Sequence, residues 1–144
     1  MIFASTSSVY GNNKKFPLKE KYNTDKPLSF YAATKKSNEV MAHAYSNIYK
    51  LPCTGLRFFT VYGPMGRPDM SLFKFSDAII NNKTIELFNK GNHYRDFTYV
   101  DDIVTSICKL LVKPSKTDVP YDIFNIGSSK PYYLKKFLSL IEDN

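Results

Sequence analysis

The fold of this chain is most constrained by a long helical segment that lies between two short apolar segments. Residues 1–5, MIFAS, form an apolar run ending in small polar residues, as is typical of a buried strand. Ser29 is suited to cap a helix, and good helix formers follow it for about five turns. A second apolar run, TGLRFFTVYG, covers residues 54–63. Because a strand, a helix and a strand follow one another, we predict an α/β fold with a parallel sheet.

The rest of the chain continues this alternation of strands and helices. We expect three further strands, over residues 85–88 (IELF), 95–100 (RDFTYV) and 121–127 (YDIFNIG). We expect three further helices, over residues 71–82, from residue 101 and from residue 132. Asp101 and Asp102 favour a helix N-terminus, where their charges complement the helix dipole, and we interpret them as structural acids.

A tyrosine and a lysine lie four positions apart within the long helix. Four residues are close to one helical turn, so Tyr31 and Lys35 should project from the same face. An ammonium group near a phenol favours the phenolate, which would make Tyr31 a usable base. The same spacing also occurs by chance in amphipathic helices, so the pair predicts catalysis only in combination with other residues.

Hydroxyl side chains gather at the end of the first predicted strand, at Ser5, Thr6, Ser7 and Ser8. Ligands of open parallel sheets bind at the carboxyl ends of the strands, so these hydroxyls and the long helix can share a site. A hydroxyl donor, a phenol and a lysine are suited to removing a proton from a substrate alcohol while a hydride leaves its carbon. The combination therefore indicates alcohol oxidation and reduction.

The usual phosphate-binding turn of dinucleotide-binding proteins is missing. No subset of the six glycines forms the Gly-rich turn that seats a pyrophosphate at a helix N-terminus. Residues 63–69, GPMGRPD, contain two glycines at a suitable interval, but Asp69 stands where a third would lie. Any cofactor that this chain contacts would have to be held without that cradle.

The net charge of +7 raises the possibility of an anionic partner. However, the lysines occur singly or in pairs, and no nucleic-acid-binding motif accompanies them, so we predict no nucleic-acid partner. A basic binding protein stays open as an alternative that rests on charge alone.

Cys53 and Cys108 have no metal-ligand spacing and predict reduced thiols without a metal. His43 and His93 have no acid–base or metal spacing, and we predict no role for them. No signal peptide opens the sequence, and no apolar run approaches the roughly 20 residues of a membrane span. We expect a soluble, cytoplasmic protein with no membrane partner.

Five motifs in register along nearly the whole chain resemble the extended short-chain dehydrogenase/reductase family, specifically its nucleotide-sugar epimerases. They are STSSVYG (5–11), YAATK (31–35), GLRFFTVYGP (55–64), RDFTYVDD (95–102) and FNIG (124–127). Within this family, residues 55–75 look most like the UDP-glucuronate 4-epimerases. The resemblance implies NAD as cofactor and epimerisation at C4 of a UDP-sugar through transient oxidation to the 4-keto sugar. The implied conversion is UDP-glucuronate to UDP-galacturonate.

The resemblance also implies roles for individual residues. Its catalytic residues are Thr6, the hydroxyl donor, Tyr31, the base, and Lys35, which also binds the nicotinamide ribose. Its cofactor-binding residues are Tyr31, Lys35, Phe58 and Phe59, and its substrate-binding residues are Ser7, Ser8, Thr60, Arg67, Glu86, Phe88 and Arg95. In this assignment Arg95 contacts the diphosphate, and residues 85–88 line the uracil pocket.

Two short segments discriminate between branches of the family. Related dehydratases carry Thr-Asp-Glu where this chain has Thr6, Ser7 and Ser8, so the absence of a carboxylate favours epimerisation over elimination of water. Galactose-type epimerases usually have Asn where this chain has Thr60. Thr60 and Arg67 are suited to holding the carboxylate of glucuronate. UDP-glucose 4-epimerase-like activity stays open as the alternative.

The resemblance implies two incomplete domains. Residues 1–64 and 98–127 would be the remainder of an NAD-binding Rossmann-like domain, and residues 65–97 and 128–144 part of a nucleotide-sugar-binding domain. A full member begins with further strand and helix units, so we expect an internal fragment that is inactive alone and does not bind NAD measurably.

Full-length members are expected to form homodimers. The first strand of this chain would be left as an uncovered sheet edge, which favours self-association. A non-catalytic remnant is the remaining alternative.

Overall fold

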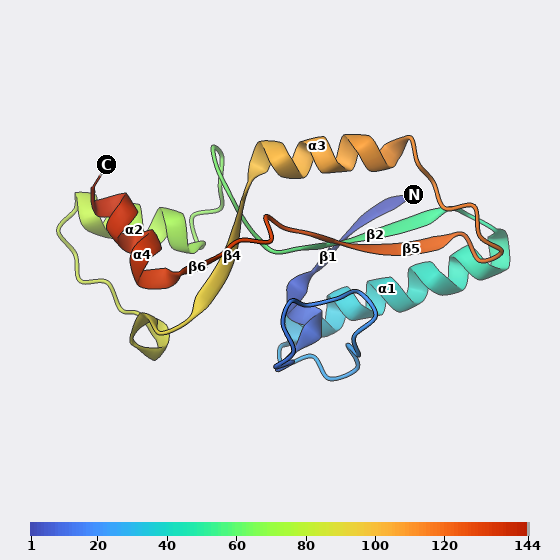
Figure 1. The fold of residues 1–144 in the computed structure, drawn as a ribbon, viewed down its shortest axis with the longest axis horizontal. Helices are drawn as coiled ribbons and strands as arrows, with labels where there is room; N and C mark the ends of the chain where they lie inside the picture. Colours follow the sequence, from blue (N-terminus) through green and yellow to red (C-terminus); the bar gives the residue numbers. More distant parts are fainter. Residues whose placement is uncertain (144) are drawn as a thin grey trace. The chain divides into compact units, whose positions relative to one another are not determined.

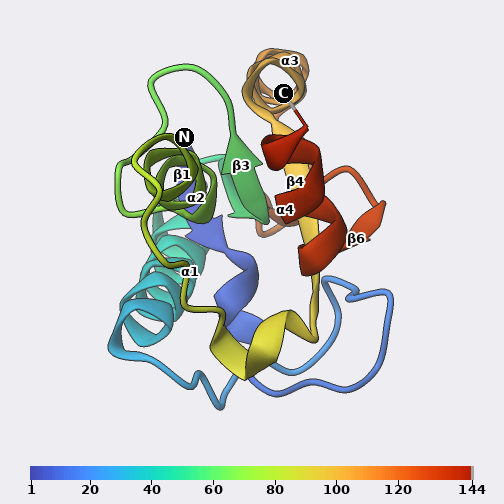
Figure 2. The same cartoon turned by 90° about the vertical axis from the view of Figure 1, so that its left-hand side faces the viewer.

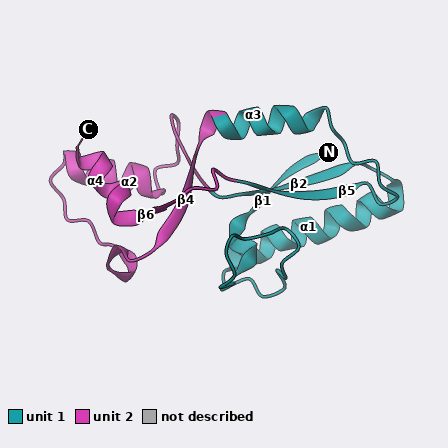
Figure 3. Cartoon of the chain, viewed as in Figure 1, with its two compact units in different colours: residues 1–59, 102–126 teal, residues 60–101, 127–144 magenta. Residues whose placement is uncertain are grey.

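The computed structural model describes residues 1–143 (Figure 1). The chain separates into two compact units, coloured in Figure 3. Unit 1 comprises Met1–Phe59 and Asp102–Ile126, and unit 2 comprises Thr60–Asp101 and Gly127–Asn144. The chain passes from one unit to the other after residues 59, 101 and 126. The expected domain boundaries, after residues 64, 97 and 127, lie within a few residues of these positions. The binding roles that we assigned to the two domains stay predictions.

Unit 1 is built on a parallel sheet, as predicted. The strand order is β1 (Ile2–Thr6), β2 (Cys53–Phe58) and β5 (Tyr121–Ile126), and both neighbouring pairs run parallel. Helix α1 (Phe30–Tyr49) contacts all three strands, and Figure 1 shows α3 (Val100–Leu111) on the other side of the sheet. Within the described residues, β1 has β2 as its one strand neighbour and is therefore an edge strand.

Helix α1 begins and ends where local chemistry requires it. The Ser29 side chain accepts a hydrogen bond of 3.1 Å from the Ala32 backbone N–H, which confirms the predicted cap. The helix ends at Tyr49, because the C-cap residue Lys50 adopts the left-handed conformation with φ of 51°. The buried positions along the helix are Ala32, Glu39, Ala42 and Ser46. Three of these four side chains are small, so α1 can pack closely against the sheet.

Unit 2 combines a small mixed sheet with two helices. Strand β4 (Tyr94–Tyr99) lies between β3 (Thr60–Tyr62), which is parallel to it, and β6 (Pro131–Tyr133), which is antiparallel. Helices α2 (Ser71–Ile80) and α4 (Leu134–Glu142) pack against each other, and α4 crosses β4 in the view of Figure 2. The core consists of Phe75, Phe97 and Leu134, and the Phe97 ring stacks on Phe137 with centroids 3.9 Å apart.

The predicted strand over residues 85–88 is wrong. This segment is irregular and leads into a short 3-10 turn, η2 (Phe88–Gly91). Ile85 and Leu87 pack against the core of unit 2, whereas Glu86 and Phe88 are exposed. The alternating pattern therefore reflects burial of every second side chain without a neighbouring strand to supply backbone hydrogen bonds.

Three other boundaries differ from the prediction. The run over residues 54–63 divides at Phe59, whose N–H donates to the Ile126 carbonyl, so that β2 and β3 belong to different sheets. Helix α2 ends at Ile80 because Asn82 adopts a left-handed φ of 52°. The short strand β6 precedes α4, which begins at Leu134.

Among residues 1–143, no helix has both the length and the apolar character that a membrane crossing requires.

Candidate functional site

The tyrosine and lysine of the predicted catalytic pair lie on one face of α1. The Tyr31 side chain is 51% exposed in the first turn of the helix. The Lys35 Nζ lies 6.0 Å from the centroid of the Tyr31 ring and donates a 3.3 Å hydrogen bond to the Ala4 carbonyl of β1. The lysine therefore bridges the helix and the strand that leads to Thr6, while the phenol stays open to a ligand.

Thr6 ends β1 and caps the short 3-10 turn η1 (Ser7–Tyr10). Its Oγ1 accepts a hydrogen bond from the Ser8 N–H and donates one to the Ser8 Oγ, both at 3.2 Å. Thr6 is buried, Ser7 is half-buried and Ser8 is exposed. The structure thus gives Thr6 a local role as a cap, and the hydroxyl most open to a ligand in this turn belongs to Ser8.

The two predicted nicotinamide-flanking residues, Phe58 and Phe59, are half-buried at the end of β2. Like Thr6, Ser7, Ser8, Tyr31 and Lys35, they belong to unit 1. The β1 and β2 strands run parallel, with Thr6 beside Phe58. These residues are therefore associated with the carboxyl ends of adjacent strands, where parallel sheets bind ligands.

A buried ion pair that the motif analysis missed lies next to this group. Arg57 of β2 donates two hydrogen bonds of 2.8 Å to the Glu39 carboxylate of α1, and both side chains are only 4% exposed. Ser5 donates a third hydrogen bond, of 2.6 Å, to the same carboxylate. Burial raises the pKa of Glu39, but the hydrogen bonds from Arg57 and Ser5, with the charges of Arg57 and Lys36, outweigh it and hold that pKa below its ordinary value.

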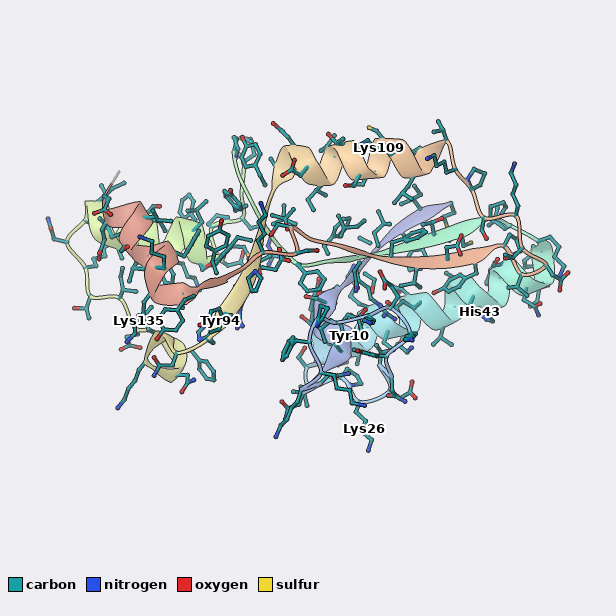
Figure 4. All side chains as sticks on the ribbon, viewed as in Figure 1. Tyr10, Lys26, His43, Tyr94, Lys109 and Lys135 are labelled. Atoms are coloured by element: carbon teal, nitrogen blue, oxygen red, sulfur yellow. The ribbon has the colours of Figure 1, made fainter. Side chains whose placement is uncertain are left out.

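Tyr10 extends this network across the turn after β1 (Figure 4). Its hydroxyl accepts a 2.9 Å hydrogen bond from Arg57 Nη1 and donates one of 2.7 Å to Asn125 Oδ1. Burial raises the pKa of Tyr10, so its phenol is neutral and can donate. Arg57 Nη1 also donates to the Glu20 carbonyl, and Asn125 Nδ2 to the Leu18 carbonyl. The network therefore ties the loop before α1 to the ends of the strands.

One signal in the sequence could have revealed the network. Arg57 is a charged residue inside an otherwise apolar strand, and a buried charge requires a partner. Glu39 follows Lys35 by four residues, so it lies on the same side of α1 as the predicted pair. The strand register then brings Ser5, Arg57 and Asn125 to one level across the sheet.

In unit 2, four of the predicted substrate-binding residues line one cavity of about 320 Å³. They are Thr60, Glu86, Phe88 and Arg95. The apolar lining comes from Met70, Phe75, Leu87 and Leu134, and the remaining polar lining from Asp69, Ser71, Lys74 and His93. The cavity combines an apolar wall, an exposed aromatic ring and charges of both signs, which suits a ligand with a flat base and an anionic group.

Arg67 does not line this cavity with the other four. Its guanidinium makes a bidentate pair with Asp69, with Nε–Oδ1 and Nη2–Oδ2 distances of 3.0 and 2.6 Å. The hydrogen bonds from Arg67 lower the pKa of the Asp69 carboxyl. The predicted reader of a substrate carboxylate is therefore engaged by a carboxylate of its own loop.

Over residues 1–127 the chain matches the model of the NAD dependent epimerase/dehydratase family. The chain belongs to this family. It is 53% identical to Protein CapI of Staphylococcus aureus and 48% identical to a probable UDP-glucuronate 4-epimerase of Rhizobium meliloti. Each alignment covers 99% of this chain and 46 to 47% of the relative, so the chain spans about half the length of the curated relatives it matches.

Solved structures of epimerases resemble it over the same span. The UDP-glucuronic acid 4-epimerase of Bacillus cereus, solved with UDP-glucuronic acid and NAD, is 35% identical, with a TM-score of 0.88 over 99% of this chain and 44% of that one. The UDP-N-acetylglucosamine 4-epimerase of Methanobrevibacter ruminantium is 32% identical, with a TM-score of 0.87. The Rossmann-like α/β class predicted from the sequence is thereby confirmed.

Within residues 1–143, no cluster of His, Cys, Asp or Glu is suited to hold a metal ion.

Proposed function

We propose that this chain carries the proton-transfer and nucleotide-recognition residues of an NAD-dependent UDP-sugar 4-epimerase, with UDP-glucuronate as the preferred substrate. The observation that carries the proposal is the pair on α1, an exposed Tyr31 with Lys35 on the same face and in contact with β1. The relatives named as UDP-glucuronate 4-epimerases support the choice of reaction.

The residues of unit 1 fit the nicotinamide end of NAD better than its pyrophosphate end. Lys35 offers an ammonium group to a ribose hydroxyl, and Phe58 and Phe59 offer aromatic surface. In the described part of the chain, no Gly-rich turn leads into a helix N-terminus that could seat the pyrophosphate. We therefore propose that the chain alone binds NAD no more tightly than the millimolar range.

In the proposed reaction, the phenolate of Tyr31 accepts the proton of the sugar C4 hydroxyl, and the C4–H bond breaks so that a carbonyl forms at C4. NAD, when bound, supplies the hydride acceptor and then the hydride donor at C4. Return of the hydride to the opposite face of C4, and of the proton from Tyr31 to the oxygen, gives the epimer. Lys35 lies on the same face of α1 as Tyr31 and is suited to bind the nicotinamide ribose, and the exposed Ser8 hydroxyl is suited to orient the sugar.

The test fuses the chain to the segments of the Staphylococcus aureus relative that the alignment does not cover. Conversion of UDP-glucuronate is then measured for the fusion and for Tyr31→Phe. We expect the substitution to lower kcat by at least about 100-fold, because proton transfer at C4 loses its acceptor. Tyr45→Phe, an equally exposed tyrosine of α1, is the matched control and should leave kcat unchanged. A Tyr31→Phe fusion with undiminished kcat would refute the proposal.

A neutral UDP-hexose is the second candidate substrate, because Arg67 is paired with Asp69. Comparison of kcat/KM for UDP-glucuronate and UDP-glucose in the same fusion distinguishes the two. If Arg67 exchanges Asp69 for the substrate carboxylate, Arg67→Ala should lower kcat/KM for UDP-glucuronate by about 30-fold or more and spare UDP-glucose. Equal losses on both substrates would favour the neutral sugar.

A further inference from the structure

The cavity of unit 2 contains a histidine that none of the sequence motifs assigned to it. His93 lies two residues before Arg95, and both residues line the cavity. Its ring lies edge-on to Phe88, with centroids 6.4 Å apart. Because Phe88 is largely exposed, a base stacked on its ring would place the rest of a nucleotide close to His93.

The backbone holds His93 from both sides. Its N–H donates a 2.9 Å hydrogen bond to the Gly91 carbonyl, and its own carbonyl accepts one of 3.0 Å from the Leu134 N–H at the start of α4. Gly91 has a left-handed φ of 74°, and a Cβ there would approach side-chain atoms of Leu87 and Lys135 to 3.1 Å. The backbone position of His93 is therefore fixed by the fold, and the residue contributes to the lining of the cavity.

A buried nitrogen of the imidazole is the next feature of His93. Among the described residues, its Nδ1 is buried and has no hydrogen-bond partner. Such an atom is costly to leave unpaired, and native structures usually complete it with a ligand or water. Burial and, to a smaller extent, the charge of Arg95 lower the pKa of His93, so the ring is neutral at neutral pH in the free protein.

Charged groups of both signs surround the ring. Those that line the cavity or pack on the segment before β4 are Asp69, Lys74, Glu86, Lys90, Arg95 and Lys135. Of these charges, that of Arg95 lowers the pKa of the imidazole. An anion bound by Arg95 would offset this repulsion and would itself favour a positive charge on His93.

We propose that His93 is a further ligand-binding residue, which takes up a proton when a nucleoside diphosphate occupies the cavity and donates a hydrogen bond from its imidazolium to the diphosphate. The inference rests on the proposed function, because it takes the ligand of the cavity to be a nucleotide-sugar. The proton comes from solvent, and the diphosphate stays fully ionised. Binding is therefore tighter below the pKa of His93 in the complex and weakens as the pH rises through that value.

The test uses the whole chain with 15N-labelled histidine, because the sequence has only two histidines and each gives its own ring signals. UDP-glucose is the probe, since its diphosphate has no group that titrates near neutral pH. His43, which packs edge-on against Tyr121 in unit 1, is the internal control (Figure 4). The ring signals are followed as a function of pH with and without the probe.

We expect UDP-glucose to raise the pKa of His93 and to leave the ring signals of His43 unchanged. The affinity should rise about fivefold from about pH 8 to about pH 6. His93→Gln should remove this dependence on pH while keeping the affinity at high pH within about twofold, and His43→Gln should retain it.

Two results would overturn the inference, and they differ in what they say about the proposed function. In the first result, UDP-glucose binds and Arg95→Ala weakens the binding, but UDP-glucose does not raise the pKa of His93 and His93→Gln keeps the parent's dependence of affinity on pH. The role of His93 is then refuted, and the proposed function stands. If UDP-glucose shifts no signal of unit 2 at any pH, the cavity is not a nucleotide site, and the proposed nucleotide-recognition role fails together with the inference.

Discussion

The two units of this chain bury different chemistry at their centres. Unit 1 buries the Arg57–Glu39 pair with polar partners from a turn, a loop and strand β1. Unit 2 buries an apolar core around Phe75, Phe97 and Leu134. The stability of unit 1 should therefore depend on ionisation and on matched partners, whereas that of unit 2 should depend on side-chain volume.

The two Arg–carboxylate pairs sharpen the same comparison. Arg57–Glu39 and Arg67–Asp69 are both bidentate, but the side chains of the second pair are 72% and 57% exposed. Solvent screens the second pair, which can exchange its partner at little cost. The first pair is withdrawn from solvent and is better suited to hold α1 against β2 than to bind a ligand.

The largest effect should come from removing one charge of the buried pair. Arg57→Met leaves the Glu39 carboxylate buried without its partner, which should cost about 3 to 5 kcal/mol of unfolding free energy. Urea unfolding followed by hydrogen exchange should show loss of protection in unit 1 and little change in unit 2. The double variant Arg57→Met/Glu39→Leu removes both charges and should recover much of the stability. A double variant no more stable than the single one would contradict this account.

Acid should remove part of that same contribution. Because the folded-state pKa of Glu39 lies below the ordinary value of 4.5, its stabilisation is complete above about pH 4.5 and is lost as the pH falls through the folded-state value. Glu39→Gln should be less stable than the parent at neutral pH, and the gap in urea midpoint should close as the pH is lowered. A constant gap would show that the carboxylate charge is unimportant.

A smaller effect is expected from reducing volume in the core of unit 2. Phe97→Leu removes the ring that stacks on Phe137 and should cost about 1 to 3 kcal/mol. Because no ionisable group takes part in that contact, the loss should be the same at acidic and neutral pH. Hydrogen exchange should report it in unit 2, and a loss confined to unit 1 would contradict the division of the chain.

The smallest effect should follow from breaking the exposed pair. Asp69→Asn removes the partner of Arg67, but both side chains are largely in solvent, so the urea midpoint should stay within measurement error. The same variant in the fusion protein frees Arg67 and should lower KM for UDP-glucuronate. A clear loss of stability would show that the loop over residues 63–70 depends on the pair.

Residues with local signals were predicted well. The strand, helix and strand of unit 1, the Ser29 cap and the shared face of Tyr31 and Lys35 all follow from periodicity and capping, which act within a few residues. The segment over residues 85–88 was misjudged because alternating burial resembles a strand even where no strand pairs with it. His93 was passed over because its neighbours in sequence give no sign of the cavity that it lines.

The sequence by itself thus determined the α/β class, the position of the long helix and the shared face of Tyr31 and Lys35, because these depend on short-range spacing. Only the tertiary structure decided which polar residues are buried in the scaffold and which stay exposed. Ser5 and Tyr10 belong to the same motif as Thr6, yet they bond to Glu39 and Arg57, residues more than 30 positions away. Such partners are set by the register of parallel strands and the packing of α1, and a strand register depends on the whole sheet.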